Sequence, residues 1–163
     1  MKWIIATACI AGLAGCVSYG EPALIPGKST AAEAEARLGE PAQRLKLANG
    51  DSAIYFSRLP YGRAMYVVTV GPDGVMKSIE QRMNQATFAK VVANRSTKQE
   101  VNELLGPPAK VGRLERQQRE WWEYRYAYTY PRIVYVQFSD DGVVREMVDV
   151  ADDDQRSFGR RRD

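Results

Sequence analysis

The sequence predicts an α+β fold made of two tandem repeats, each with a short helix or helical hairpin packed on a three- or four-stranded antiparallel sheet. Three observations predict it. Short helical segments lie between capping residues and helix breakers, β-branched and aromatic runs alternate with turn signals, and the same motifs recur at a nearly constant offset.

Each predicted helix has a clear beginning and end. It begins at a threonine with a glutamate three residues later, a capping box in which the two residues satisfy each other's backbone N–H groups. It ends at a glycine, which a left-handed C-terminus favours, and prolines then prevent continuation. The two sets are Thr30, Glu33, Gly39 and Pro41, and Thr97, Glu100, Gly106 and Pro108. A further helix over 85–93 is expected before the second set, from apolar residues at i, i+3 and i+4.

Strands are predicted after the helices in both halves. The runs Ala64 to Val70 and Ile133 to Phe138 are too rich in β-branched and aromatic residues to prefer a helix. Turn signals such as Asn49-Gly50 and Asp141-Gly142 separate the runs. We therefore expect antiparallel hairpins.

The motifs recur in the same order in the two halves. The offset is 67 at the capping threonine and becomes 68 at an Asp-Gly-Val turn, through an insertion of one residue. Two separated matches in one order indicate a tandem duplication. We expect a degenerate first repeat over 27–83, a second repeat over 84–150 and a charged, disordered tail over 151–163.

The first residues are typical of a secretory signal peptide over 1–15. Lys2 precedes an apolar run that is too short to cross a bilayer. The run ends in Leu13-Ala14-Gly15-Cys16, which resembles a lipobox. We expect cleavage before Cys16, acylation of its sulfur and a tether over 16–26. Because Val17 follows in place of aspartate, we expect anchoring to the outer membrane, facing the periplasm; an ordinary signal peptide is the alternative.

The composition argues against several classes of function. The chain has no histidine and two cysteines, and Cys9 lies in the predicted signal. This leaves no Ser-His or Cys-His pair and few ligands for zinc, so we expect no catalytic residue, no metal and no cofactor beyond the lipid on Cys16. A hydrolase with paired carboxylates and weak calcium binding at Asp152 to Asp154 are the remaining alternatives. A net charge of +3 does not indicate a nucleic-acid partner.

The segment Glu120 to Tyr130 is the most aromatic part of the chain. Read as one strand, it places an aromatic residue at every second position of one face. We expect Trp122 and Tyr124 in the core. Short helices should leave the rest of that face uncovered, so the candidate partner-binding residues are Tyr126, Tyr128, Tyr130 and Arg125. Packing between the two repeats is the alternative.

Three arginines lie close together just before this strand. Arg113, Arg116 and Arg119 are candidates for contact with anionic lipid headgroups. Solvated loop charges explain the same residues without a partner. The two interpretations stay open at this stage.

The second repeat carries a set of motif residues: Thr97, Glu100, Gly106, Pro108, Trp122, Tyr124, Phe138, Asp141 and Gly142. In these residues it resembles the SmpA/OmlA family of outer-membrane lipoproteins. The resemblance implies a structural motif rather than a catalytic one, a lipid anchor, and support of envelope assembly through binding of another envelope protein. Tandem copies also look like β-lactamase inhibitory proteins. Our leading hypothesis is a non-enzymatic, protein-binding accessory that supports outer-membrane β-barrel assembly or envelope integrity. The alternative is a periplasmic enzyme inhibitor or binding module. The oligomeric state is not predicted.

Overall fold

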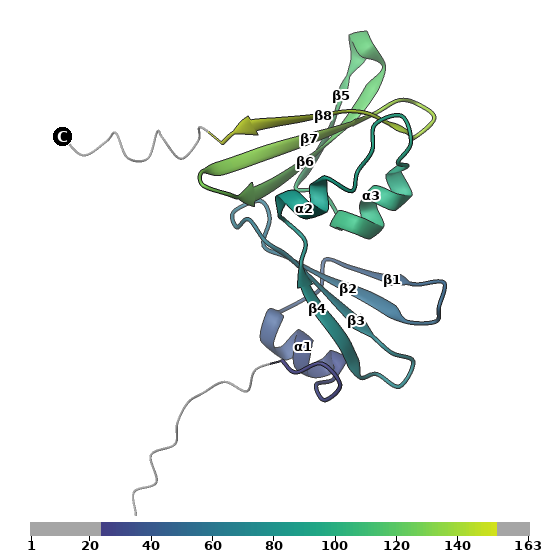
Figure 1. The fold of residues 1–163 in the computed structure, drawn as a ribbon, viewed down its shortest axis with the longest axis vertical. Helices are drawn as coiled ribbons and strands as arrows, with labels where there is room; N and C mark the ends of the chain where they lie inside the picture. The colour runs from purple at the N-terminus through teal and green to yellow at the C-terminus, as the bar shows by residue number, and fades with distance from the viewer. Residues whose placement is uncertain (1–23, 153–163) are drawn as a thin grey trace, which may run out of the picture.

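The structure is a computed structural model that describes residues 24–152 (Figure 1). The predicted signal peptide, Cys16, and most of the predicted tether and tail lie outside these residues. Within them the fold is α+β, with two four-stranded antiparallel sheets and three short α-helices. None of these helices is long and apolar enough to cross a membrane.

The first half of the described chain is one helix followed by one sheet. The strands pair in chain order, β1-β2-β3-β4. The predicted strand over 64–70 is confirmed as β3. The elements are α1 (Ala31–Leu38), β1 (Gln43–Lys46), β2 (Ser52–Ser57), β3 (Met65–Val70) and β4 (Met76–Gln81).

The second half has two helices and a longer sheet of order β5-β6-β7-β8. Its elements are α2 (Gln85–Phe88), α3 (Lys98–Leu105), β5 (Lys110–Leu114), a 3-10 turn (Glu115–Gln117), β6 (Arg119–Ala127), β7 (Pro131–Phe138) and β8 (Val144–Ala151).

Two predicted elements in this half are too long. The helix expected over 85–93 ends at Phe88 because the next N–H groups, of Lys90 and Val91, donate to carbonyls three residues back, and the chain then turns. The strand expected over 120–130 ends at Ala127, and a turn follows before β7.

Both capping boxes are confirmed. The Thr30 hydroxyl accepts from the N–H of Glu33 at 3.3 Å, and the corresponding bond at the start of α3 is 3.2 Å. The helix ends differ from the prediction. Gly39 and Gly106 have φ of 86° and 78°, but their ψ of −166° and −171° is extended rather than left-handed helical. This conformation is nearly restricted to glycine, and it sends the chain directly toward the next strand.

The elements form four layers (Figure 1). α1 packs on one face of the first sheet, around Ala34, Phe56 and Val68. α2 and α3 lie between the two sheets, in a larger core that draws side chains from both. The order of the layers is therefore α1, first sheet, α2 with α3, second sheet.

The last turn of α3 is held by groups from both sheets. The Tyr55 hydroxyl of β2 donates to the carbonyl of Glu103 at 2.6 Å. The Tyr124 hydroxyl of β6 donates to the carbonyl of Gly106 at 3.0 Å, and Arg82 bonds a further carbonyl of this turn. These donors satisfy carbonyls that have no partner within the helix, so the helix end ties the two halves together.

Candidate binding face

One face of the second sheet carries no helix in the described part of the chain (Figure 1). α2 and α3 cover the opposite face, where Trp122 and Tyr124 contribute to the core. Since side chains alternate along a strand, the neighbouring positions point away from the helices. We call this surface the open face. Its centre is a hollow of about 330 Å³, lined by Leu114, Trp121, Tyr135, Gln137 and Val148.

Trp121 lies flat against the neighbouring strand because the opposite residue is a glycine. Gly112 pairs with Trp121 across β5 and β6. A Cβ at Gly112 would stand 2.2 Å from the indole Cζ2, so no other residue leaves room for the ring. Tyr135 meets the indole edge to face, with ring centroids 5.5 Å apart. Such a geometry adds a specific attraction to the burial of both rings.

Charged residues surround this apolar centre. Arg119 bonds Glu146 at 2.9 Å and Gln137 at 3.1 Å. Farther along the strand, Arg125 bonds Glu123 at 2.8 Å. An apolar, aromatic centre within a polar rim is the composition of protein-binding surfaces.

One part of the rim is a buried ionic cluster. Asp152 is 4% exposed and accepts from Arg63 of the β2–β3 loop at 2.6 Å. Arg125 stands 3.6 Å from the same carboxylate, and its partner Glu123 is 3% exposed. Buried charges are tolerated when they are paired. The cluster holds the end of β8 to the first half, and it includes Asp152, one of the residues of the predicted tail.

The three candidate tyrosines do not share a surface. Tyr126 is 1% exposed, which corrects its prediction as a partner-binding residue. The expectation failed because α2 extends the helical cover: the Phe88 ring packs 5.1 Å from that of Tyr126. Burial raises the pKa of Tyr126, and its hydroxyl donates to Asp149 at 2.8 Å. Tyr128 and Tyr130 are 63% and 71% exposed, in the turn after β6.

The three candidate headgroup residues are spread over β5, the 3-10 turn and the start of β6. Arg113 bonds Asp140 at 2.9 Å, and Arg119 bonds Glu146. Arg116 is exposed in the turn. Two of the three positive charges are thus matched by carboxylates, which favours the interpretation as paired surface charge. Contact with a lipid headgroup stays a prediction.

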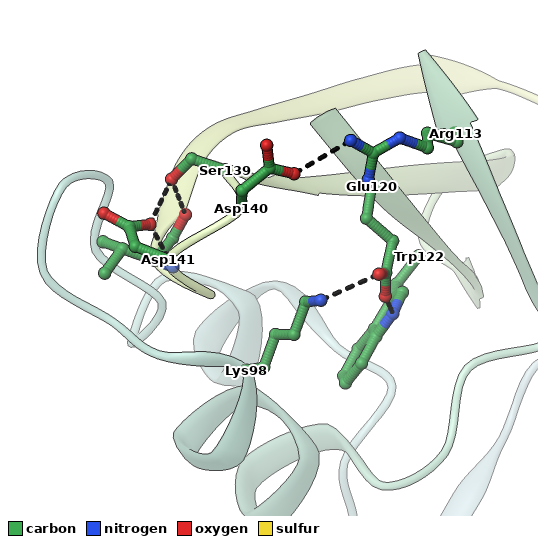
Figure 2. A network of polar contacts seen from close by, with 8 residues as sticks. Lys98, Arg113, Glu120, Trp122, Ser139, Asp140 and Asp141 are labelled. Atoms are coloured by element: carbon green, nitrogen blue, oxygen red, sulfur yellow. Dashed lines mark hydrogen bonds and ion pairs between the residues drawn. The ribbon is translucent and has the colours of Figure 1, made fainter. Parts of the chain in front are cut away.

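A polar network joins the start of α3 to the second sheet (Figure 2). Lys98 reaches Glu120 at 2.8 Å, and the Trp122 indole N–H donates to the same carboxylate at 2.6 Å. Partial burial raises the pKa of Glu120, but the two hydrogen bonds and the positive charges of Lys98 and Arg113 together outweigh it, so the pKa lies below its usual value. Lys98 also stands 5.7 Å from the centre of the Phe138 ring. The network fixes the helix on the sheet.

The motif residues have structural positions. Thr97 and Glu100 cap α3, and Tyr124 and Phe138 are fully buried. In the β7–β8 turn, Gly142 has a φ of 77°. The Asp141 carboxylate there accepts from the Ser139 hydroxyl and from the N–H of Val143 (Figure 2), and both bonds lower its pKa. Pro108 lies between α3 and β5. These residues shape the fold and leave the open face to other side chains.

The main residues of the open face were not among the sequence candidates. The alternation of side chains along the predicted strand puts Trp121 on the face opposite the aromatic one, together with Glu123 and Arg125. A signal for the site was present: Tyr135, Gln137 and the valine at 148 alternate with core positions on the next two strands. Of the candidates, only Arg125 and Arg119 lie on or beside this face.

The open face has the composition of a binding surface. The chain has no histidine. Within residues 24–152 no group of three or more acidic or cysteine residues is arranged to hold a metal ion. The acidic side chains nearest the hollow, Glu123 and Glu146, are each paired with an arginine. The face presents an apolar area for contact, surrounded by polar and charged side chains.

Comparison with known proteins gives little more. No family model matches the chain, and no curated protein matches its sequence. Among solved structures the chain is similar to a DUF4309 family protein (YjgB) from Bacillus subtilis, with 17% identity and a TM-score of 0.31 over 78% of this chain and 82% of that one.

Proposed function

We propose that this chain is a non-enzymatic, protein-binding lipoprotein, anchored in the outer membrane and facing the periplasm. The observation that carries the proposal is the open face, where Trp121 and Tyr135 form the centre of an apolar hollow with a charged rim. Large aromatic residues at the centre of a patch contribute most of the binding energy in protein interfaces. The proposed partner is another envelope protein.

The anchor is the proposed acyl group on Cys16. The lipobox Leu13-Ala14-Gly15-Cys16 supports this. Each buried methylene of an acyl chain adds about 0.8 kcal/mol of membrane affinity, so several chains hold a protein permanently. The predicted tether over 16–26 leads into α1, so it would keep α1 close to the membrane, and the open face lies at the opposite end of the layers (Figure 1).

We also propose that the two halves are tandem copies. Thr30 bridges to Val75 in the first half, and Thr97 bridges to Val143 in the second. α1 and α3 each begin at a capping box and end at a glycine of positive φ. The third strand of each sheet has an irregularity against the fourth, at Thr69/Val70 and Gln137/Phe138. This common layout supports duplication. The proposed role in barrel assembly rests on the resemblance of the motifs of the second half to the SmpA/OmlA family.

Two experiments test the proposal. For the anchor, labelled palmitate is expected in the wild type and in Cys9→Ser but not in Cys16→Ser; a labelled Cys16→Ser chain contradicts lipidation there. For the binding face, a photo-crosslinking residue at Val148 is expected to capture an envelope protein, and Trp121→Ala is expected to remove the adduct. The matched control is Tyr61, which is 97% exposed on the β2–β3 loop. Adducts that are the same from both positions, or none from Val148, contradict the proposal.

A second candidate is a periplasmic inhibitor or binding module that acts on a soluble enzyme. The exposed pair Tyr128 and Tyr130 favours it, since tyrosines at the tip of a hairpin provide contact area at low entropic cost. The same crosslinking experiment separates the two candidates. A membrane-bound assembly subunit on Val148 supports the first, and a soluble hydrolase on Tyr128 supports the second.

A further inference from the structure

We infer that the open face binds a short amphipathic helix of the partner protein. This inference rests on the proposed function and names the kind of segment that the partner presents. It comes from the layer order of the molecule, in which the first sheet has helices on both faces and the second sheet has them on one.

The open face corresponds to a face that is covered in the first sheet. In β2 and β3, Tyr55 pairs with Val67, and both lie against α2 and α3. At an offset of 68, Glu123 pairs with Tyr135 on the open face. The same offset places Trp121 at the position of Ala53, another core residue of the covered face. The second sheet thus repeats, without its cover, the face on which the first sheet holds two helices.

The chemistry of the face also favours a helix. Every backbone group inside a sheet already takes part in the ladder, so a face offers only side chains to a ligand. A helix satisfies its own backbone and presents apolar side chains three and four residues apart on one side. A strand laid on this face would leave its N–H and C=O groups without partners. The apolar hollow between Leu114, Trp121 and Val148 accepts the side chains that a helix presents.

A second copy of this chain is a poor occupant. The helix that a second copy would present is α1, the outermost layer at the end opposite the open face. The exposed side of α1 carries Ala32, Glu33, Ala36 and Arg37. These residues are small or charged and have no large apolar group to fill the hollow. The rim pair Arg119 and Glu146 suits a partner helix with charges of both signs on its polar sides.

Two displayed libraries of 16-residue peptides test the inference on the full-length chain in detergent. One library places Leu, Ile or Phe at i, i+3, i+4 and i+7, and the other places the same residues at alternate positions. The helix-patterned library is expected to yield binders. Their affinity is expected to fall about tenfold or more in Trp121→Ala and in Val148→Asp, and to stay unchanged in Tyr61→Ala. Val148→Asp keeps the test valid if the tryptophan variant does not fold.

Other outcomes overturn the inference. The inference fails if neither library yields binders, if only the alternating library does, or if both do so equally. It also fails if the affinity of the binders is unchanged in Trp121→Ala and Val148→Asp. Displacement of the peptides by a second copy, or tighter binding after deletion of residues 153–163, would assign the face to this chain itself. If Val148 still captures an envelope protein while the helix library fails, the partner is not helical and the proposed function stands. If Val148 captures nothing, the proposed function fails.

Discussion

Replacing Gly106 by alanine is expected to reveal the packing of the first half against α3. Gly106 and Gly39 end α3 and α1 with nearly the same backbone, at φ of 78° and 86°. At Gly39 nothing lies within 4 Å of an added Cβ. At Gly106 that atom would stand 2.7 Å from Cδ1 of Tyr55 and 3.2 Å from Cε of Met65, both in the first sheet. Gly39→Ala is therefore a matched control for the backbone effect alone.

The expected losses of stability follow from this geometry. Forcing alanine into a glycine-only backbone region costs about 1–3 kcal/mol, which applies to both variants. The clash with the buried Tyr55 adds about 1–3 kcal/mol to Gly106→Ala, as overpacking of a core does. Urea unfolding of the two variants and the wild type measures the difference, provided that the m-value is unchanged. Equal losses in the two variants would refute the packing of α3 against the first sheet.

Three further variants test local features. Thr97→Ala is expected to lower the free energy of unfolding by about 1 kcal/mol through loss of the cap, and an unchanged midpoint in urea would count against it. Lys98→Met is expected to raise the pKa of Glu120, because a hydrogen bond to the carboxylate is lost while burial stays; an unmoved carboxyl titration by NMR would contradict the network. Tyr126→Phe removes a buried hydroxyl bond and is expected to cost about 1 kcal/mol, whereas Tyr128→Phe at the exposed turn is expected to cost nothing, and equal midpoints would contradict this difference.

Local features of the fold could be predicted from the sequence. A capping box such as Thr97 and Glu100 involves four consecutive residues, so nothing distant alters it. The turn at Asp141 and Gly142 is equally local, and the residues around it alternate because both flanking strands have one face against a core. For this reason the α+β class was predictable.

The candidate site could not be predicted because it depends on how distant elements pack. Tyr126 is buried only because α2 and its Phe88 lie over the end of β6. The alternation of side chains along β6 separates its two faces. It does not show which face the helices cover, or how far along the strand they extend. The bond between Arg63 and Asp152 joins residues 89 positions apart, and no local pattern marks such a pair.

The conformation of Gly106 shows a limit of another kind. A glycine after a helix predicts positive φ, and this is confirmed at 78°. The sequence rule also favours a left-handed ψ, whereas the observed ψ is −171°. Pro107 and Pro108 follow at once, and the chain runs straight into β5 rather than closing a further turn. The connection to the next strand therefore determines ψ.

Hydroxyl-radical footprinting in intact envelopes tests most directly whether a partner covers the open face. The oxidation of Trp121 and Tyr135 is compared between envelopes and the purified chain, with the exposed Tyr61 as the internal reference. We expect both open-face residues to be protected in envelopes, Tyr61 to react equally in the two samples, and Val148→Asp to abolish the protection. Equal oxidation of Trp121 in envelopes and in the purified chain would contradict a protein-binding role for this face.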